Sequence, residues 1–263
     1  MALAPLHHTD SPVAVAGSPH RILRCEDSDA VALARLLAQD DGRDDARLAY
    51  LDLCIKKPWG YEIRIYDDVV SEAWLLCLEP GASTSMHAHP RKATLLLCVD
   101  GSGRLTTGEG EQIALTPGAV VQIMPGSRHQ SSTEQGMRLI EVEAPRDKTD
   151  LVRFADGSGR AHQGYEGVDA ACAQAVAGRD LAPLRPARQG PPRARVRESC
   201  SDGDLRFRLE GGSQIAARTD GLHAAISLEV GPILRHEFTV LDAAAAAAAP
   251  RAATYLTVRS AQG

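Results

Sequence analysis

The residues that decide the fold are Gly81-Ala-Ser-Thr-Ser-Met-His-Ala-His-Pro-Arg-Lys-Ala-Thr-Leu-Leu-Leu-Cys-Val-Asp-Gly101 and, shortly after them, Gly118-Ala-Val-Val-Gln-Ile-Met-Pro-Gly-Ser-Arg-His129. On a strand, residues two apart point to the same face, so His87 and His89 are expected to project together. His129 follows a Pro-Gly turn, beyond which the chain can return to the same side. Three imidazoles placed in this way supply three nitrogen ligands and leave positions open for water, oxygen or substrate.

Short runs rich in Val, Ile, Leu and Thr surround these residues between Tyr61 and about Pro145. Turn signals close the runs, among them Pro80-Gly81, Asp100-Gly101 and Pro117-Gly118. Many short, evenly spaced strands indicate an antiparallel barrel or sandwich, which leaves few exposed edges. The expected strands are 61–66, 72–78, 94–99, 103–107, 112–115, 119–124 and 137–143.

These stretches resemble the two motifs of the cupin superfamily. The first motif is a Gly, five residues, His-x-His, four residues, a Glu, six residues and a Gly. The second is a Gly followed eleven residues later by a His, with a Gly three before that His. The matching residues are Gly81, His87, His89 and Gly101 for the first motif, and Gly118, Gly126 and His129 for the second. The second motif also contains a Pro, which in this sequence is displaced by one residue, to Pro125.

The resemblance implies an all-β chain whose core is a cupin double-stranded β-helix, or jelly-roll barrel. It also implies one divalent metal ion, Fe, Zn, Mn or Ni, bound by His87, His89 and His129. The alternative is that these are ordinary surface or hydrogen-bonding histidines on a fold that has lost its metal.

The sequence departs from the motif at Thr94, where cupins usually place a metal-binding Glu. A Thr hydroxyl is a poor ligand for a divalent cation, so we expect a neutral three-His site. A metal with one carboxylate fewer is more Lewis-acidic. Such a site resembles the three-His iron centres of thiol and diketone dioxygenases. Compensation by Gln122 or another distant oxygen donor stays open at this point.

A second resemblance concerns the substrate. The segment Lys57-Pro-Trp-Gly-Tyr-Glu62 looks like the entry to the cupin domain of bacterial bifunctional mannose-6-phosphate isomerases. The segments 145–153 and 164–167 look like the exit of cupins from polysaccharide and nucleotide-sugar pathways. Together these similarities cover about residues 55–168 and imply a sugar-phosphate substrate.

Basic residues near the histidines fit an anionic substrate, because guanidinium and ammonium groups are the usual partners of phosphate. Candidate substrate-binding residues are Arg91, Lys92, Arg128 and Lys57, together with Trp59, which can stack on a sugar ring. The alternatives are solvated loop charges for the cations and a core position for the Trp.

Glu141 and Glu143 share a parity on a late strand and are the candidate catalytic residues, since both can face the cavity and move protons. The alternative is that the pair forms the solvent face of that strand.

Composition limits the partners. Lys and Arg total 29 against 34 Asp and Glu, a formal net charge of −5, so no basic excess indicates nucleic acid or an anionic membrane. No run of about 18 apolar residues predicts a membrane span. The six cysteines are scattered without a CxxC pair, which favours a reducing cytoplasm. We therefore expect a cytoplasmic protein that binds a small, anionic molecule.

The chain is expected to divide into four parts: 1–54, an extension with one helix near 29–39; 55–155, the metal-binding cupin barrel; 156–195, a linker rich in Gly, Ala, Pro and Arg; and 196–263, a smaller β-rich unit, interpreted as a degenerate cupin. Strands in the last part are expected at 205–209, 214–217, 223–230, 237–241 and 254–258. By analogy with other cupins we also expect a homodimer.

Three functions are compatible with these residues. The first is an isomerase or epimerase that acts on a phosphorylated or nucleotide-linked sugar, or a similar small polar metabolite, in a biosynthetic pathway. The second is a three-His Fe(II)-dependent oxygenase, which the absence of a carboxylate at Thr94 favours. The third is a non-catalytic module that binds a small molecule.

Overall fold

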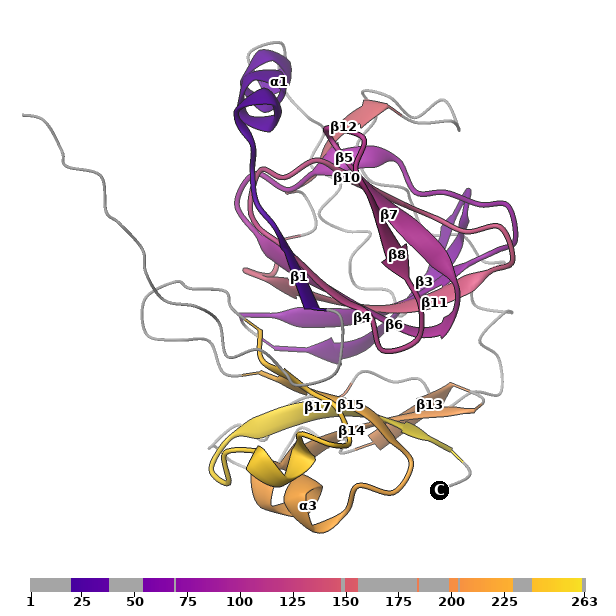
Figure 1. Cartoon of the computed structure of the whole chain (residues 1–263), viewed down its shortest axis with the longest axis vertical. Coiled ribbons are helices and arrows are strands. Elements are labelled where there is room, and N and C mark those ends of the chain that lie inside the picture. Colours follow the sequence, from indigo (N-terminus) through magenta and orange to yellow (C-terminus); the bar gives the residue numbers. More distant parts are fainter. Residues whose placement is uncertain are drawn as a thin grey trace, which may run out of the picture.

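The structure is a computed structural model that describes residues 20–37, 54–68, 70–147, 150–155, 184, 199–202, 204–228 and 238–261. A barrel of two β-sheets occupies the upper part of the molecule, and a third sheet lies below it (Figure 1). Helix α1 (Asp27–Leu37) stands at the end of the barrel opposite the third sheet. The predicted all-β fold with a short N-terminal helix is confirmed.

The barrel consists of a large and a small sheet. The large sheet has the strand order β1-β9-β6-β11-β4-β3-β2, and the small sheet has the order β12-β5-β10-β7-β8. The large sheet contains β1 (His20–Leu23), β2 (Cys54–Lys57), β3 (Gly60–Asp67), β4 (Glu72–Leu78), β6 (Ala93–Gly101), β9 (Val120–Ile123) and β11 (Met137–Ala144). The small sheet contains β5 (Met86–Ala88), β7 (Gly103–Thr107), β8 (Gln112–Leu115), β10 (His129–Ser132) and β12 (Val152–Ala155).

Side chains of the large sheet alternate between two buried environments. Residues such as Leu96 and Leu139 point into the barrel, where they pack with Leu105 of the small sheet. Their neighbours Leu95 and Ile140 point to the outer face. Because both faces are buried, the strands lack the apolar and polar alternation of a half-exposed sheet.

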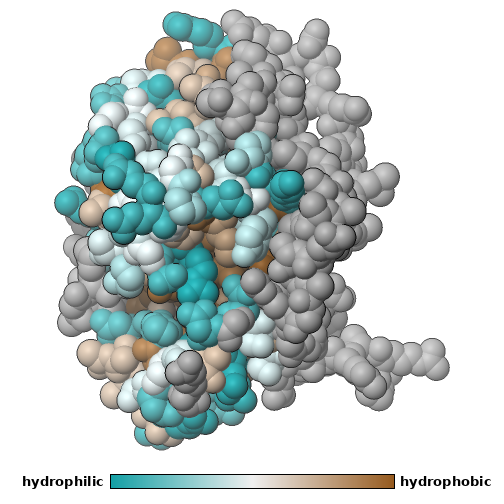
Figure 2. All heavy atoms as spheres, turned by 90° about the vertical axis from the view of Figure 1, so that its right-hand side faces the viewer, coloured by the Kyte–Doolittle hydropathy of each residue, from teal (hydrophilic) through white to brown (hydrophobic). Residues whose placement is uncertain are grey.

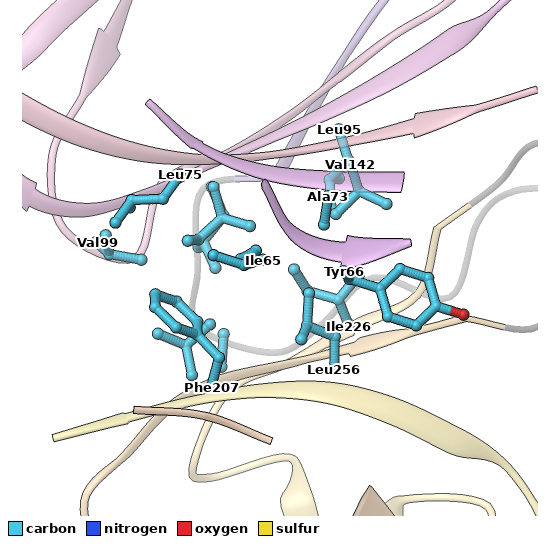
Figure 3. Packing of buried hydrophobic residues seen from close by; sticks show 14 of the residues in the cluster. Ile65, Tyr66, Ala73, Leu75, Leu95, Val99, Val142, Phe207, Ile226 and Leu256 are labelled. Carbon is cyan, nitrogen blue, oxygen red and sulfur yellow. The ribbon is translucent and has the colours of Figure 1, made fainter. Parts of the chain in front are cut away.

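The third sheet covers that outer face. It has the order β13-β14-β17-β15-β16, formed by β13 (Ser199–Asp202), β14 (Leu205–Gly211), β15 (Leu222–Ser227), β16 (Val240–Leu241) and β17 (Thr254–Ser260). Phe207, Ile226 and Leu256 point from it toward Ile65 and Leu75 of the barrel (Figure 3). The predicted second β unit is therefore present and shares a hydrophobic core with the barrel.

One predicted strand of this unit is a helix instead. Residues 214–217 fall in α3 (Gly212–Ala217), which buries Ile215 against the far face of the third sheet. The side-chain oxygen of Gln214 accepts a hydrogen bond from Gly211 N at 2.8 Å and caps the first turn. A run of only four residues does not distinguish a strand from a helix, because either element can bury one of its faces. A 3-10 turn, Ala246–Ala248, packs beside this helix.

The Lys57–Glu62 segment forms the β2–β3 hairpin. Gly60 has a φ of 136°, and a Cβ atom there would lie 2.0 Å from the carbonyl oxygen of Cys77. Only glycine fits this turn, because any side chain would collide with the backbone of β4. Trp59 O accepts a hydrogen bond from Glu79 N at 3.0 Å, which fixes the preceding residue.

The expected linker, 156–195, lies outside the described residues except for Leu184. This residue is fully buried, and its N–H donates to Ile65 O at 2.8 Å. The other domain boundaries and the homodimer stay predictions.

Nothing in the structure fixes the cellular location. No helix in the described part of the chain has the length and apolar character needed to cross a membrane. Hydrophilic residues dominate the part of the face that Figure 2 colours. Exposed large hydrophobic side chains include Val31 and Leu37 of α1. Cys54 is disulfide-bonded, whereas Cys25, Cys77, Cys98 and Cys200 form no disulfide. Disulfides persist mainly in oxidising compartments, so the cytoplasmic location stays a prediction.

Candidate metal centre

Three histidines meet on the small sheet at one end of the barrel. His87 lies in β5, His89 follows that strand directly, and His129 opens β10, where it is the antiparallel partner of His87. Their ring centroids are 4.2 to 5.5 Å apart, and their candidate ligand atoms all lie within 4.8 Å of one another. The structure therefore brings together the three imidazoles that the motif spacing selected.

Backbone carbonyls orient all three rings. The Nδ1 of His87 lies 2.8 Å from Ser85 O, that of His89 lies 2.7 Å from Asp150 O, and that of His129 lies 3.0 Å from Ser127 O. A carbonyl oxygen only accepts, so each Nδ1 carries the proton and each Nε2 keeps its lone pair. This is the usual arrangement behind a metal-binding imidazole.

Burial keeps the rings neutral. Loss of solvation lowers the pKa of His129 to about 4 and holds the pKa values of His87 and His89 well below the ordinary value. The positive charge of Lys92 acts in the same direction on each ring. Neutral imidazole is the form that binds a metal, so the ligands are ready at neutral pH.

The donor set fits a divalent transition metal. Nε2 of His89 is buried and has no hydrogen-bond partner within the described part of the chain, which is costly unless another group binds it. Imidazole nitrogens suit Zn, Fe and Ni, and three of them leave coordination positions open. His87, His89 and His129 would therefore hold one such ion.

A cavity opens above the histidines and collects most of the sequence candidates. Glu141 and Glu143 both point into it, as their shared parity on β11 predicted. Lys57, Trp59 and Lys92 also line it, and Trp59 belongs at the same time to the interior hydrophobic cluster. The remaining lining residues are Glu62, Leu76, Thr84, Ser85, Leu96, Ser131, Leu151 and Arg153.

Two buried ion pairs lie in the lining of this cavity. Lys92 Nζ lies 2.5 Å from Glu143 Oε1, and both side chains are at most 2% exposed. Lys57 Nζ lies 3.5 Å from Glu62 Oε1, with both side chains 4% exposed. Charges buried to this degree need partners, so each lysine fixes a carboxylate at the cavity wall.

Arg91 and Arg128 do not line the cavity. Arg91 bonds Asp150 Oδ1 at 3.0 Å through Nε and Asp147 Oδ2 at 2.5 Å through Nη2. Arg128 Nε bonds Asp29 Oδ1 at 2.5 Å, which fastens α1 to the barrel. Sequence proximity to the histidines selected these two arginines, but loop geometry turns both toward carboxylates outside the cavity.

Sequence reasoning missed Arg153 and Glu62 as cavity residues. Arg153 lies in β12 opposite His87 of β5, and its charge lowers the pKa of that histidine. The pairing joins residues 66 positions apart in the sequence, so local spacing does not show that Arg153 lies beside His87. Both residues carried a signal, because Glu62 closes the Lys57–Glu62 segment and Arg153 closes segment 145–153, and the sequence had selected both segments for their resemblance.

Residues 74–143 match a family model described as Cupin domain, and this segment contains all three histidines. No curated protein matches the chain. The segment that carries the histidines therefore matches a cupin domain, as its motifs predicted, while the resemblance to mannose-6-phosphate isomerases has no further support.

Solved structures with a similar fold include the following three. A sugar phosphate isomerase from Silicibacter pomeroyi is 20% identical, with 36% of this chain and 64% of that chain covered and a TM-score of 0.33. KdgF from Halomonas sp. is 20% identical, with 42% and 92% covered and a TM-score of 0.33. An RmlC-like cupin from Shewanella frigidimarina is 18% identical, with 41% and 95% covered and a TM-score of 0.34. We draw no functional conclusion from likenesses this weak.

The first prediction concerns metal binding. We expect the wild-type chain to bind one Zn²⁺, Mn²⁺, Fe²⁺ or Ni²⁺ per chain, with a thermal stabilisation that corresponds to about 2.7 kcal/mol at a hundredfold excess over Kd. His129→Ala removes a ligand and should abolish this stabilisation, measured by calorimetry and elemental analysis. His223→Ala, at an exposed position of the third sheet, is the matched control and should bind as the wild type does. Equal binding by all three proteins would contradict the site.

Proposed function

We propose that the barrel is a metal-dependent enzyme that isomerises or epimerises a small anionic metabolite, such as a phosphorylated or nucleotide-linked sugar. The observation that carries the proposal is the composition of the cavity: three imidazoles meet two carboxylates on one strand and three buried cations on others. Proton transfer next to a carbonyl needs these groups together.

The formal charges of the cavity favour an anionic substrate. Lys57, Lys92 and Arg153 supply three positive charges, and Glu62, Glu141 and Glu143 supply three negative ones, which gives a net charge of zero. A divalent cation on the neutral histidines raises this to +2. Since charge in a buried cavity is costly, a substrate with one or two negative charges would complete the balance.

Each group has a role in this reaction. The metal, when bound, would polarise a substrate carbonyl as a Lewis acid. Glu141 is the better candidate for the proton-transferring base because it is the more exposed of the two carboxylates. Glu141 is 8% exposed, against 1% for Glu143, so its carboxylate reaches the cavity more openly. Arg153 and Lys57 would bind the anionic group, and Trp59 would cover the sugar ring.

Proton transfer can be tested without knowledge of the product. The metal-loaded protein should exchange solvent deuterium into a carbon-bound position of a candidate sugar phosphate. Glu141→Gln removes the base and should slow the exchange by about 10²- to 10⁴-fold while metal binding is retained. Glu134→Gln, at a side chain that is 83% exposed, should exchange as the wild type does. No exchange into any candidate substrate by the wild-type protein would reject the proposal.

Anion binding gives an independent test. Removal of a charge-assisted hydrogen bond costs about 1.5–3 kcal/mol, so Arg153→Met should weaken binding of inorganic phosphate to the metal-loaded protein by about 10- to 100-fold. Titration calorimetry measures this affinity. Arg104→Met, at a half-exposed arginine outside the cavity, is the matched control. Equal phosphate affinity in the two variants would remove Arg153 from the substrate site.

A second candidate function is an Fe(II)-dependent oxygenase, because Thr94 leaves the histidine site without the usual fourth ligand. Protein reconstituted anaerobically with Fe(II) would then consume dioxygen only when a substrate is added. Oxygen uptake without deuterium exchange would favour this function over isomerisation. Ligand binding with neither activity would leave the non-catalytic binding module.

A further inference from the structure

A neutral residue, Thr94, occupies the position at which the cupin motif usually has a metal-binding Glu. Thr94 lies in β6, is fully buried, and points into the barrel with Leu96. Its hydroxyl oxygen has no hydrogen-bond partner among the described residues. A divalent cation on three neutral histidines would therefore lack the negative charge that this position normally supplies.

Gln122 does not replace it. In β9, Val121 and Ile123 pack in the interior cluster, while Val120 packs on the outer face. Side chains alternate along a strand, so Gln122 shares the outer face with Val120. Its amide nitrogen lies 3.7 Å from Met124 Sδ, on that same outer side. Gln122 is therefore excluded as a distant oxygen donor to the metal.

The neighbouring strand supplies a carboxylate at the right place. Glu143 of β11 is the direct antiparallel partner of Thr94. Residues paired in this way share a face, with Cβ atoms about 4.5–5.5 Å apart. Glu143 is 1% exposed and lines the same cavity as the three histidines.

Lys92 holds this carboxylate in position. Its ammonium group lies 2.5 Å from Glu143 Oε1, and its backbone N–H donates to Asp150 Oδ2 at 2.9 Å. Asp150 in turn accepts the Nδ1 proton of His89 through its backbone oxygen. One chain of contacts therefore joins the carboxylate, the lysine and a metal ligand.

We propose that Glu143 supplies the negative charge for the metal that Thr94 cannot supply, so that the carboxylate of the cupin motif has moved across the ladder from β6 to β11. Glu143 is not part of the group of ligand atoms within 4.8 Å, which contains the histidines alone. It is thus a positioning and charge-balancing residue and not a fourth direct ligand. This inference rests on the proposed metal-dependent function and deepens it.

The test measures metal affinity by competition with a chelator for Mn²⁺ and Zn²⁺, and needs no turnover. Glu143→Gln keeps the shape but removes the charge, and should lower the affinity by about 10- to 100-fold, as loss of an outer partner typically does. The exchange variant, Thr94→Glu with Glu143→Thr, returns the carboxylate to β6 and should restore the affinity to within about tenfold of the wild type. Glu134→Gln, at an exposed carboxylate outside the cavity, is the control and should leave the affinity unchanged.

A second substitution separates charge balance from a packing role. Lys92→Met keeps the volume but removes a positive charge near the metal, so it should raise the metal affinity, opposite in sign to Glu143→Gln. Circular dichroism of each variant without metal monitors the fold. A purely structural role would lower the affinity in both variants.

The outcomes distinguish this inference from the proposed function. Wild-type affinity in Glu143→Gln, or an exchange variant that folds but stays as weak as Glu143→Gln, would overturn the inference alone. Metal binding that follows the expected order without deuterium exchange would support the inference and reject the isomerase. A wild-type chain that binds no metal would overturn both.

Discussion

The orientation of the three imidazoles depends on hydrogen bonds from Nδ1 to backbone carbonyls, and the rest of the centre follows from them. His87 and His129 use the same local device, in which the ring donates to the carbonyl of a serine two residues earlier. His89 differs, because its acceptor, Asp150 O, lies 61 residues away. The first two rings are oriented by residues close to them in the sequence, whereas the third is oriented only when the chain after β11 closes over the barrel.

Asp150 therefore links the folding of the chain after β11 to the geometry of the histidine centre. Its carboxylate accepts from the backbone N–H groups of Arg91 and Lys92 and from the guanidinium of Arg91. These bonds fix the loop that follows His89 and set the start of β6. The same residue thus orients one ligand through its backbone and places Lys92 at the cavity wall through its side chain. Arg91, chosen from the sequence as a substrate residue, contributes here by holding Asp150.

The sequence predicted the parts of the centre that depend on local spacing. Strand geometry and turn chemistry account for three of these parts. They are the interval between His87 and His89, the turn before His129, and the shared parity of Glu141 and Glu143. The sequence did not predict β5 and β10, which are three and four residues long, or β1, whose parallel pairing with β9 joins distant segments. The sequence also did not show which of the basic side chains face the cavity. Whether a basic residue faces a cavity or a neighbouring carboxylate depends on loops, which carry no periodic signal.

The C-terminal sheet explains why one motif position can change without loss of the barrel. It buries the outer face of the large sheet, so β4 is buried on both sides along its whole length. Apolar side chains on that outer face, such as Leu95 and Val142, contribute to the stability of β6 and β11 together with the interior cluster. At the histidine end the interior positions of the two strands are polar, as Thr94 and Glu143 are. A carboxylate on β11 can therefore take over from one on β6, because both strands present the same depth of the cavity and neither depends on that residue for its packing.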